Sequence, residues 1–338
     1  MKKFLRPALL CLLTLASLPP AWAQMTPQLV KDIYPGVEGS FPSDMVVFNG
    51  ALYFEANDGA QGDGLYKSDG TAAGTVLVKD INPGAGDADI SQMVVVNGTL
   101  YFNADDGTHG DELWKSDGTE AGTVLVKDIN PGAGDSYPYY LVVFNGTMYF
   151  QATDGTHGYE LWQTDGTEAG TVMVKDINPG AGDSYPGYLV VFNGALYFAA
   201  TDGINGYELW KSDGTAAGTV MVKDINPGAD NSNPYNFVVV NGTLYFRADD
   251  GTHGGELWKS DGTEAGTVLV KDINPSGESS PNNFAVVNGT LYFTADDGIN
   301  GYELWKSDGT EAGTMLVKDI NPGAGHSYPN DKVVFNGT

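Results

Sequence analysis

The sequence predicts an all-β fold, a β-propeller of four-stranded antiparallel blades, from three observations. A unit of 48 residues recurs along nearly the whole chain, and a fixed period of this length is typical of propellers and other stacked repeats. Each unit contains four short β-branched, aromatic or alternating runs separated by turns rich in Gly, Asn and Asp. No stretch has the spacing of an amphipathic helix.

A Lys-Asp-Ile triplet marks the period. Successive copies lie 48 residues apart, except that the last step is 47 residues because the loop 274–281 is one residue shorter. Loops tolerate such deletions better than strands do. The lysines of the triplet are Lys31, Lys79, Lys127, Lys175, Lys223, Lys271 and Lys318.

One unit shows how the strands are expected to follow one another. A continuous apolar run at 189–192 predicts a strand buried on both faces. Asn193-Gly194 is a two-residue hairpin turn, because both positions need positive φ. Strands at 196–200 and 207–211 follow, and the alternating run 220–225 completes the sheet.

Such a sheet has two faces to cover and little core of its own, so its neighbours must cover it, as in a propeller. The most apolar strand, 189–192, is expected to be innermost, and the alternating strand, 220–225, outermost.

The phase of the repeat predicts six complete blades, from about Phe41 to Ile320, and an incomplete seventh. A lone outer-type strand is expected at Leu29–Ile33 and a lone inner-type strand at Val333–Phe335. Because the last residues form half of a hairpin, we expect the reading frame to continue beyond Thr338.

Residues 1–23 have the features of a signal peptide. Lys2, Lys3 and Arg6 precede a short apolar stretch, and Ala21-Trp22-Ala23 fits a cleavage site. The apolar stretch is too short to span a bilayer, so we expect no membrane insertion and a secreted or cell-surface protein. Residues 24–338 form the repeat domain, and Cys11, the chain's one cysteine, is lost with the signal.

The chain is strongly acidic, with a formal net charge of −26. Without the signal, 14 basic residues remain against 43 acidic ones. This charge disfavours nucleic acid and anionic lipid as partners and suits an exported protein, a Ca²⁺-rich environment or a cationic partner.

The segment Tyr207-Glu-Leu-Trp-Lys-Ser-Asp-Gly-Thr215, which recurs from Glu112, Glu160, Glu256 and Glu303, resembles the ELWxxDGT repeat family of exported bacterial proteins. The first copy departs from the pattern with Gly64-Leu65-Tyr66. The resemblance covers nearly all of residues 24–338. It implies a propeller-like secreted or surface protein and no defined enzymatic activity.

Most recurring motifs are expected to be structural. The aspartate of each Ser-Asp-Gly-Thr turn, such as Asp213, is expected to accept backbone hydrogen bonds. The recurring tryptophans are expected to pack between adjacent sheets. They are Trp114, Trp162, Trp210, Trp258 and Trp305.

Acidic pairs in Gly-rich loops are the weak candidates for a Ca²⁺ site, because carboxylate oxygens are its usual ligands. No other cofactor is indicated. Histidines in equivalent loops lack a second ligand at metal spacing, and Asn205 and Asn300 replace them elsewhere, so a zinc site is not expected. The acidic pairs are Asp105 and Asp106, Asp249 and Asp250, and Asp296 and Asp297.

Alternate turns of an up-and-down sheet lie on opposite ends, so the loops around 105–110 and 130–138 should share one face. Tyrosines beside acidic groups on that face could bind carbohydrate or a protein ligand. The candidate ligand-binding residues are Tyr137, Tyr139, Tyr140, Tyr185, Tyr188, His109, His157 and His253.

These features favour a non-enzymatic, multivalent binding or structural module. Residues 24–338 have a single arginine, Arg247, which excludes sialidase chemistry, and no Gly-x-Ser-x-Gly motif is present. Near-identical units also leave little room for a dedicated catalytic site. The alternative is a secreted carbohydrate-active hydrolase with its site in a further C-terminal part.

Overall fold

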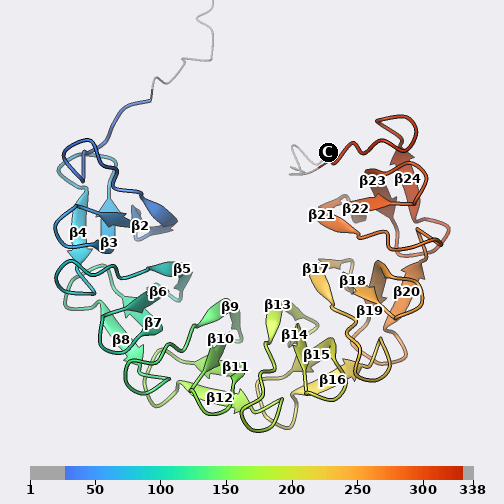
Figure 1. The fold of residues 1–338 in the computed structure, drawn as a ribbon, viewed down its shortest axis with the longest axis horizontal. Coiled ribbons are helices and arrows are strands. Elements are labelled where there is room, and N and C mark those ends of the chain that lie inside the picture. Colours follow the sequence, from blue (N-terminus) through green and yellow to red (C-terminus); the bar gives the residue numbers. More distant parts are fainter. Residues whose placement is uncertain (1–26, 330–338) are drawn as a thin grey trace, which may run out of the picture.

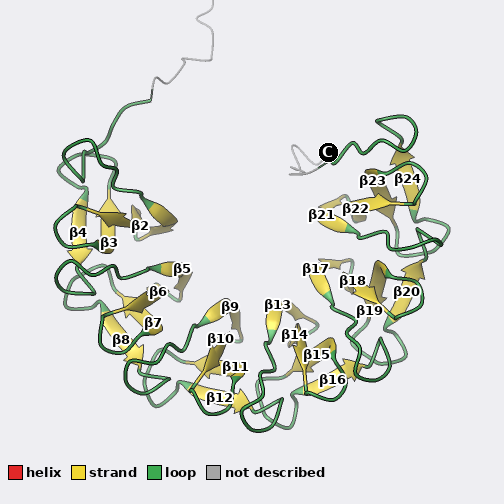
Figure 2. Ribbon diagram, in the orientation of Figure 1, coloured by secondary structure: helices red, strands yellow, loops and turns green. Residues whose placement is uncertain are grey.

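The computed structural model describes residues 27–329, which contain twenty-four strands. Figure 2 shows strands joined by loops throughout this part, and within it no helix is long and apolar enough to cross a membrane. The predicted signal peptide and the predicted strand at 333–335 lie outside the described residues.

The strands form six sheets of four. The first three sheets are β1 (Ser43–Phe48), β2 (Ala51–Asn57), β3 (Asp63–Ser68) and β4 (Val76–Lys79); β5 (Ser91–Val96), β6 (Thr99–Asp105), β7 (Asp111–Ser116) and β8 (Val124–Lys127); and β9 (Tyr139–Phe144), β10 (Thr147–Thr153), β11 (Tyr159–Thr164) and β12 (Val172–Lys175).

The last three sheets are β13 (Gly187–Phe192), β14 (Ala195–Thr201), β15 (Tyr207–Ser212) and β16 (Val220–Lys223); β17 (Tyr235–Val240), β18 (Thr243–Asp249), β19 (Gly255–Ser260) and β20 (Val268–Lys271); and β21 (Asn282–Val287), β22 (Thr290–Asp296), β23 (Tyr302–Ser307) and β24 (Met315–Lys318).

Each sheet is an antiparallel meander whose strands pair in sequence order. Figure 1 shows the first strand of each sheet facing a common centre and the fourth on the outside, and the arc of six sheets is open between β1–β4 and β21–β24. The all-β, propeller-like repeat is therefore confirmed. The hairpin turn is confirmed too, because Asn193 and Gly194 have φ of 47° and 74°.

The apolar core lies between sheets rather than within them. Phe144 and Tyr149 of one sheet pack with Phe198 and Trp210 of the next. Trp210 is 5% exposed and Phe198 is fully buried. The same arrangement recurs at each junction, which confirms that the tryptophans pack between adjacent sheets.

A lysine on the outer strand ties each sheet to the next. Lys175 Nζ donates a hydrogen bond of 2.7 Å to the Thr219 carbonyl of the following sheet. The same ammonium lies 5.8 Å from the centre of the Trp210 ring, a cation–π contact. The lysine of the Lys-Asp-Ile triplet is therefore an inter-sheet contact.

A buried glutamate fixes the loop that leads into the next sheet. Glu160 Oε2 accepts hydrogen bonds of 2.7 Å from the Ile177 amide and from the Ser184 hydroxyl. Its side chain is fully buried, and burial raises its pKa to about 7. Glu112 and Glu208 have the same environment, and burial raises their pKa to about 7 as well.

Two expectations about the strands are wrong. Leu29–Ile33 forms no strand, because residues 27–329 contain no sheet before it that could offer an edge to pair with. Ile33 packs on the first sheet instead, and Lys31 Nζ keeps a hydrogen bond to the Thr75 carbonyl. The run 189–192 is not buried on both faces, because β13 lies at the open centre, where Val191 is 40% exposed.

Removing one inter-sheet lysine should destabilise the fold. In Lys175→Met the Thr219 carbonyl loses its donor, and an unsatisfied buried acceptor costs about 1–3 kcal/mol. Urea unfolding monitored by tryptophan fluorescence measures this loss. The control is Lys318→Met, since no further sheet follows Lys318 in the described chain; an equal loss in both variants would contradict the role assigned to Lys175.

Stability should fall as the pH rises from about 4.5 to 7. Folding raises the pKa of Glu112, Glu160 and Glu208 from 4.5 to about 7. In this range the folded state binds more protons than the unfolded state, and deprotonation therefore costs stability. Below this range the aspartates of the Ser-Asp-Gly-Thr turns oppose the trend, because hydrogen bonds from Thr215 and its equivalents lower their pKa.

The melting temperature should therefore be highest near pH 5 and decline toward pH 8. Replacing the three glutamates with glutamine should flatten this decline, whereas Glu168→Gln, at an exposed turn position, should leave it unchanged. A melting temperature that rises from pH 5 to pH 8 would contradict the assignment.

Candidate ligand-binding groove

A β-bulge near the start of each inner strand redirects one side chain. In the fourth sheet Gly187 pairs with Ala199, but the next pair is Val190 with Tyr197, so one extra residue is inserted. Tyr188 at this bulge has φ of 58°, and Tyr140 in the third sheet has 59°. Bulges commonly re-aim side chains next to functional sites, and a left-handed tyrosine is uncommon.

The redirected Tyr140 and Tyr188, together with Tyr235, which stands just before the bulge of the fifth sheet, form an inner row along the centre of the arc. The ring of Tyr188 lies 5.7 Å from that of Tyr140 and 6.0 Å from that of Tyr235. Beyond Tyr235 the row ends at Arg247, whose guanidinium lies 5.0 Å from the ring centre. These are contact distances for aromatic and cation–π pairs.

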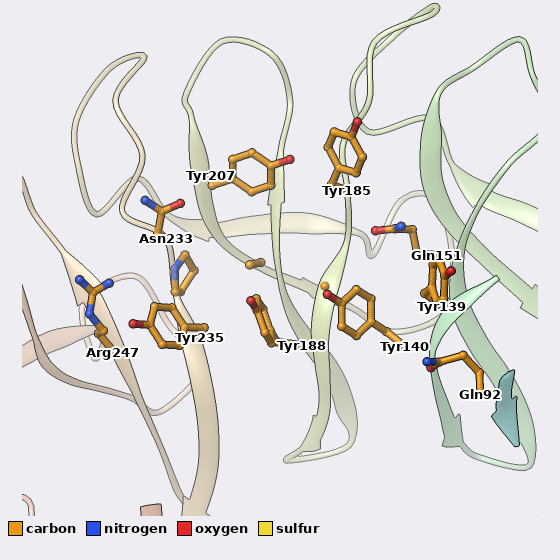
Figure 3. A pocket seen from close by; sticks show the side chains of 13 residues that line it. Gln92, Tyr139, Tyr140, Gln151, Tyr185, Tyr188, Tyr207, Asn233, Tyr235 and Arg247 are labelled. Carbon is orange, nitrogen blue, oxygen red and sulfur yellow. The ribbon is translucent and has the colours of Figure 1, made fainter. Parts of the chain in front are cut away.

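A second row, the loop row, comes from the loops before the inner strands and from the first residues of β11 and β15. Tyr137 lies 6.5 Å from Tyr159, Tyr159 stacks on Tyr185 at 5.2 Å, and Tyr185 stacks on Tyr207 at 6.5 Å. Figure 3 shows Tyr185 and Tyr207 on one side of the pocket and Tyr140, Tyr188 and Tyr235 on the other.

The two rows border a groove of about 710 Å³ that spans the third, fourth and fifth sheets and reaches Gln92 of the second. Its lining is made of aromatic, amide and small side chains with one guanidinium. The lining residues are Gln92, Tyr139, Tyr140, Gln151, Tyr185, Gly187, Tyr188, Ala199, Tyr207, Asn233, Pro234, Tyr235 and Arg247.

The groove is open because the fourth sheet, which forms the middle of the groove, contributes small residues to the lining. Gly187 and Ala199 face each other on adjacent strands. The neighbouring sheets have tyrosines at the position of Gly187, namely Tyr139 and Tyr235. They also have a larger side chain at the position of Ala199. A tyrosine at 187 would fill the space between the rows.

The positions that face the groove differ widely between repeats that are otherwise nearly identical. The position of Gly187 changes from serine to tyrosine, glycine and asparagine, whereas the Leu-Trp-Lys-Ser-Asp-Gly-Thr segment barely changes. The position of Ala199 holds a different residue in every repeat, with a carboxylate in the first and a guanidinium in the fifth. Its residues are Glu55, Asn103, Gln151, Ala199, Arg247 and Thr294.

Tyr140 and Tyr207 in the groove carry neutral hydroxyl groups at ordinary pH. Burial raises the pKa of Tyr207 to about 12, and burial also raises the pKa of Tyr140. Each can therefore donate and accept hydrogen bonds. The one charged lining residue is Arg247, and its Nη2 forms an ion pair of 2.8 Å with Glu278.

The sequence candidates divide into two groups. Tyr139, Tyr140, Tyr185 and Tyr188 line the groove, and Tyr137 lies behind them, stacked on Tyr139 at 6.2 Å. The histidines do not line it, because each bonds to an aspartate within its own turn. His109, His157 and His253 place Nδ1 2.8, 2.8 and 2.9 Å from Asp106, Asp154 and Asp250.

The acidic pairs proposed for Ca²⁺ accept hydrogen bonds within their own loops. Asp105 Oδ1 accepts from the Gly107 amide at 2.7 Å, and Asp106 Oδ1 accepts from the His109 amide at 2.9 Å. Residues 27–329 contain no group of three or more His, Cys, Asp or Glu side chains arranged to hold a metal ion. The equivalent aspartates behave alike: Asp249 and Asp250, and Asp296 and Asp297.

Several lining residues were not among the sequence candidates. They come from sheets whose loops carry no tyrosine pair, or from the middle strands. The variation between repeats at these positions is the signal that could have identified them. They are Gln92, Gln151, Tyr207, Asn233, Tyr235 and Arg247.

Comparison with known proteins gives distant likenesses of fold. No protein-family model and no curated protein matches the sequence. A puromycin hydrolase is similar over 93% of this chain and 49% of its own, with 16% identity and a TM-score of 0.49. A prolyl endopeptidase is similar over 84% of this chain and 43% of its own, with 14% identity and a TM-score of 0.47. The chain thus spans less than half the length of these two proteins.

A computationally designed protein, Ika8, is similar over 89% of this chain and 93% of its own, with 15% identity and a TM-score of 0.40. These likenesses are too distant to bear on the groove.

Proposed function

We propose that this chain is an exported, non-enzymatic binding module and that its tyrosine groove binds a carbohydrate. The observation that carries the proposal is the variation between repeats. Positions that pack one sheet on the next stay nearly constant, while positions that face the groove change in size, charge and aromatic character. The groove thus combines different side chains at one place on a uniform scaffold.

The chemistry of the lining favours a sugar. Pyranose rings have apolar C–H faces that stack on aromatic rings, and the inner row offers three such rings in succession. Their hydroxyl rims need donors and acceptors, which neutral tyrosines and the amides of Gln92, Gln151 and Asn233 supply.

The lining also supports a non-enzymatic role. Hydrolysis of a glycosidic bond generally needs two carboxyl groups flanking that bond. The groove is lined by no aspartate, glutamate or histidine. Because its lining comes from four different sheets, it is one composite site rather than an array of identical weak sites.

The features that favour export are the predicted signal at residues 1–23 and the acidic composition. A protein that displays a sugar groove outside the cell would act by attachment or capture. This role needs no cofactor and no nucleic-acid partner.

We further propose that a seventh sheet closes the arc into a propeller. In the described chain, Ile320 and Val317 of the last sheet are 51% and 43% exposed. Their counterparts in the fourth sheet, Ile225 and Val222, are 3% and 7% exposed because the next sheet covers them. The same kind of cover is what a further repeat would provide.

Filling the groove should weaken binding without disturbing the fold. Gly187→Tyr copies the residue of the neighbouring sheets, and the new Cβ would lie 3.5 Å from the Tyr140 ring, an ordinary contact. A glycan array first identifies the oligosaccharide that the wild type binds most tightly. Calorimetric titration with this oligosaccharide should show that Gly187→Tyr binds at least about tenfold more weakly than the wild type, a loss of about 1.4 kcal/mol.

The matched control is Asn282→Tyr, which places tyrosine at the same position of the sixth sheet, outside the groove. Both variants should melt at the wild-type temperature. Equal affinity in the two variants, or no glycan bound by the wild type, would contradict the proposal.

Covering the last sheet should stabilise it. A chain with a full copy of the unit 219–266 inserted after residue 313, in register, should show slower amide hydrogen exchange in β21–β23, because burial of the exposed apolar side chains disfavours local opening. Unchanged exchange in these strands would count against a closing sheet.

A further inference from the structure

We propose that the carbohydrate bound by the groove carries a carboxylate, and that Arg247 holds this carboxylate at the end of the groove formed by the fifth sheet. The inference rests on the proposed function and adds the chemical class of the sugar, an acidic one such as a uronate. Its starting point is a set of substitutions found in the fifth sheet alone.

Arg247 is the single arginine outside the first 26 residues of the sequence. It lies on β18, at the position where the other sheets have Glu55, Asn103, Gln151, Ala199 or Thr294. Its side chain lines the groove and is 11% exposed. A cation has therefore been introduced at one place in an otherwise uncharged lining.

The neighbour of Arg247 on the next strand has changed with it. The third, fourth and sixth sheets begin their third strand with tyrosine, whereas the fifth begins with Gly255. Any Cβ at 255 would collide with the guanidinium. The glycine therefore makes the space that the arginine occupies.

The guanidinium is held in one orientation. It stacks over Tyr235 at 5.0 Å, and Nη2 pairs with Glu278 at 2.8 Å. Glu278 occupies the loop position of Asp135 and Asp183, and its side chain is 57% exposed. Since a half-exposed glutamate can turn into solvent, a carboxylate arriving from the groove can replace it.

Part of the guanidinium has no partner. Arg247 Nε is buried and makes no hydrogen bond to any described residue. Buried polar groups are nearly always paired, and one that is not calls for an explanation. Arginine binds carboxylates through two parallel N–H groups, so a ligand carboxylate that displaces Glu278 gives Nε the acceptor that it lacks.

The charge of the rest of the chain confines the binding of an anion to the neighbourhood of Arg247. The sequence has a net charge of −26 and would repel an anion at most surfaces. Arg247 lies at the end of the inner row, beyond Tyr235. A carboxylate bound there directs the remaining sugar rings along Tyr188 and Tyr140. Discrimination against neutral sugars then comes from one preformed contact.

The test compares two oligosaccharides of equal length and linkage, α-1,4-linked oligogalacturonate and its carboxyl-reduced, neutral counterpart, by calorimetry. The wild type should bind the acidic probe at least tenfold more tightly. The double variant Arg247→Thr/Gly255→Tyr copies the sixth sheet, which has Thr294 and Tyr302 at these positions, so that the space of the arginine is refilled. This variant should bind both probes equally.

Equal binding of the two probes by the wild type, or a preference that survives in the double variant, would overturn the assignment of Arg247 while leaving carbohydrate binding intact. If neither probe binds the wild type, the wild type and the double variant are compared on the glycan array. Acidic glycans that bind the wild type and not the double variant support the assignment, and binding of neutral glycans alone overturns it. Failure of every glycan to bind would overturn both proposals.

Discussion

The structure depends on one constraint: a four-stranded sheet of this size cannot bury its own apolar side chains, so each sheet relies on the next. Phe198 is fully buried only because residues of the preceding sheet cover it. Where no sheet follows, Ile320 remains 51% exposed. Hydrophobic burial between neighbours therefore fixes the side chains that form the junctions, and identical junctions explain the near-identity of the repeats.

The same constraint leaves few positions free to vary, and many of these face the groove. The inner strands do not carry the inter-sheet core alone, so bulges and left-handed residues are tolerated there. A left-handed backbone costs about 1–2 kcal/mol for a residue such as Tyr188. The ring contacts of Tyr188 with Tyr140 and Tyr235 offset this cost, since aromatic pairs contribute about 0.5–1.5 kcal/mol each.

Much of the fold could be predicted from the period and from turn chemistry. Asn193-Gly194 and the burial of Trp210 both follow from local pattern. The prediction of a strand at Leu29–Ile33 was wrong because a strand needs the edge of another strand to pair with, and composition does not show whether one is present. The prediction that residues 189–192 are buried on both faces was wrong. An apolar run is expected both for a strand between two sheets and for a strand beside an open centre, so the sequence alone does not separate the two positions.

The groove was predicted only in part, since tyrosines such as Tyr140 and Tyr188 were recognised but their arrangement was not. The bulges that align them do not show in the sequence. Gly187 and Arg247 could have been found by asking where otherwise identical repeats differ. Histidines such as His109 were grouped with the tyrosines on a shared face, yet their aspartate partners hold them in separate turns.

The most direct test of the central claim, that the two tyrosine rows enclose a sugar-binding groove, is a crystal structure of the chain with a bound oligosaccharide. The account predicts sugar rings stacked along Tyr140, Tyr188 and Tyr235, above Gly187 and Ala199. A sugar bound at the aspartate turns or on the outer strands, with the groove holding only solvent, would contradict it.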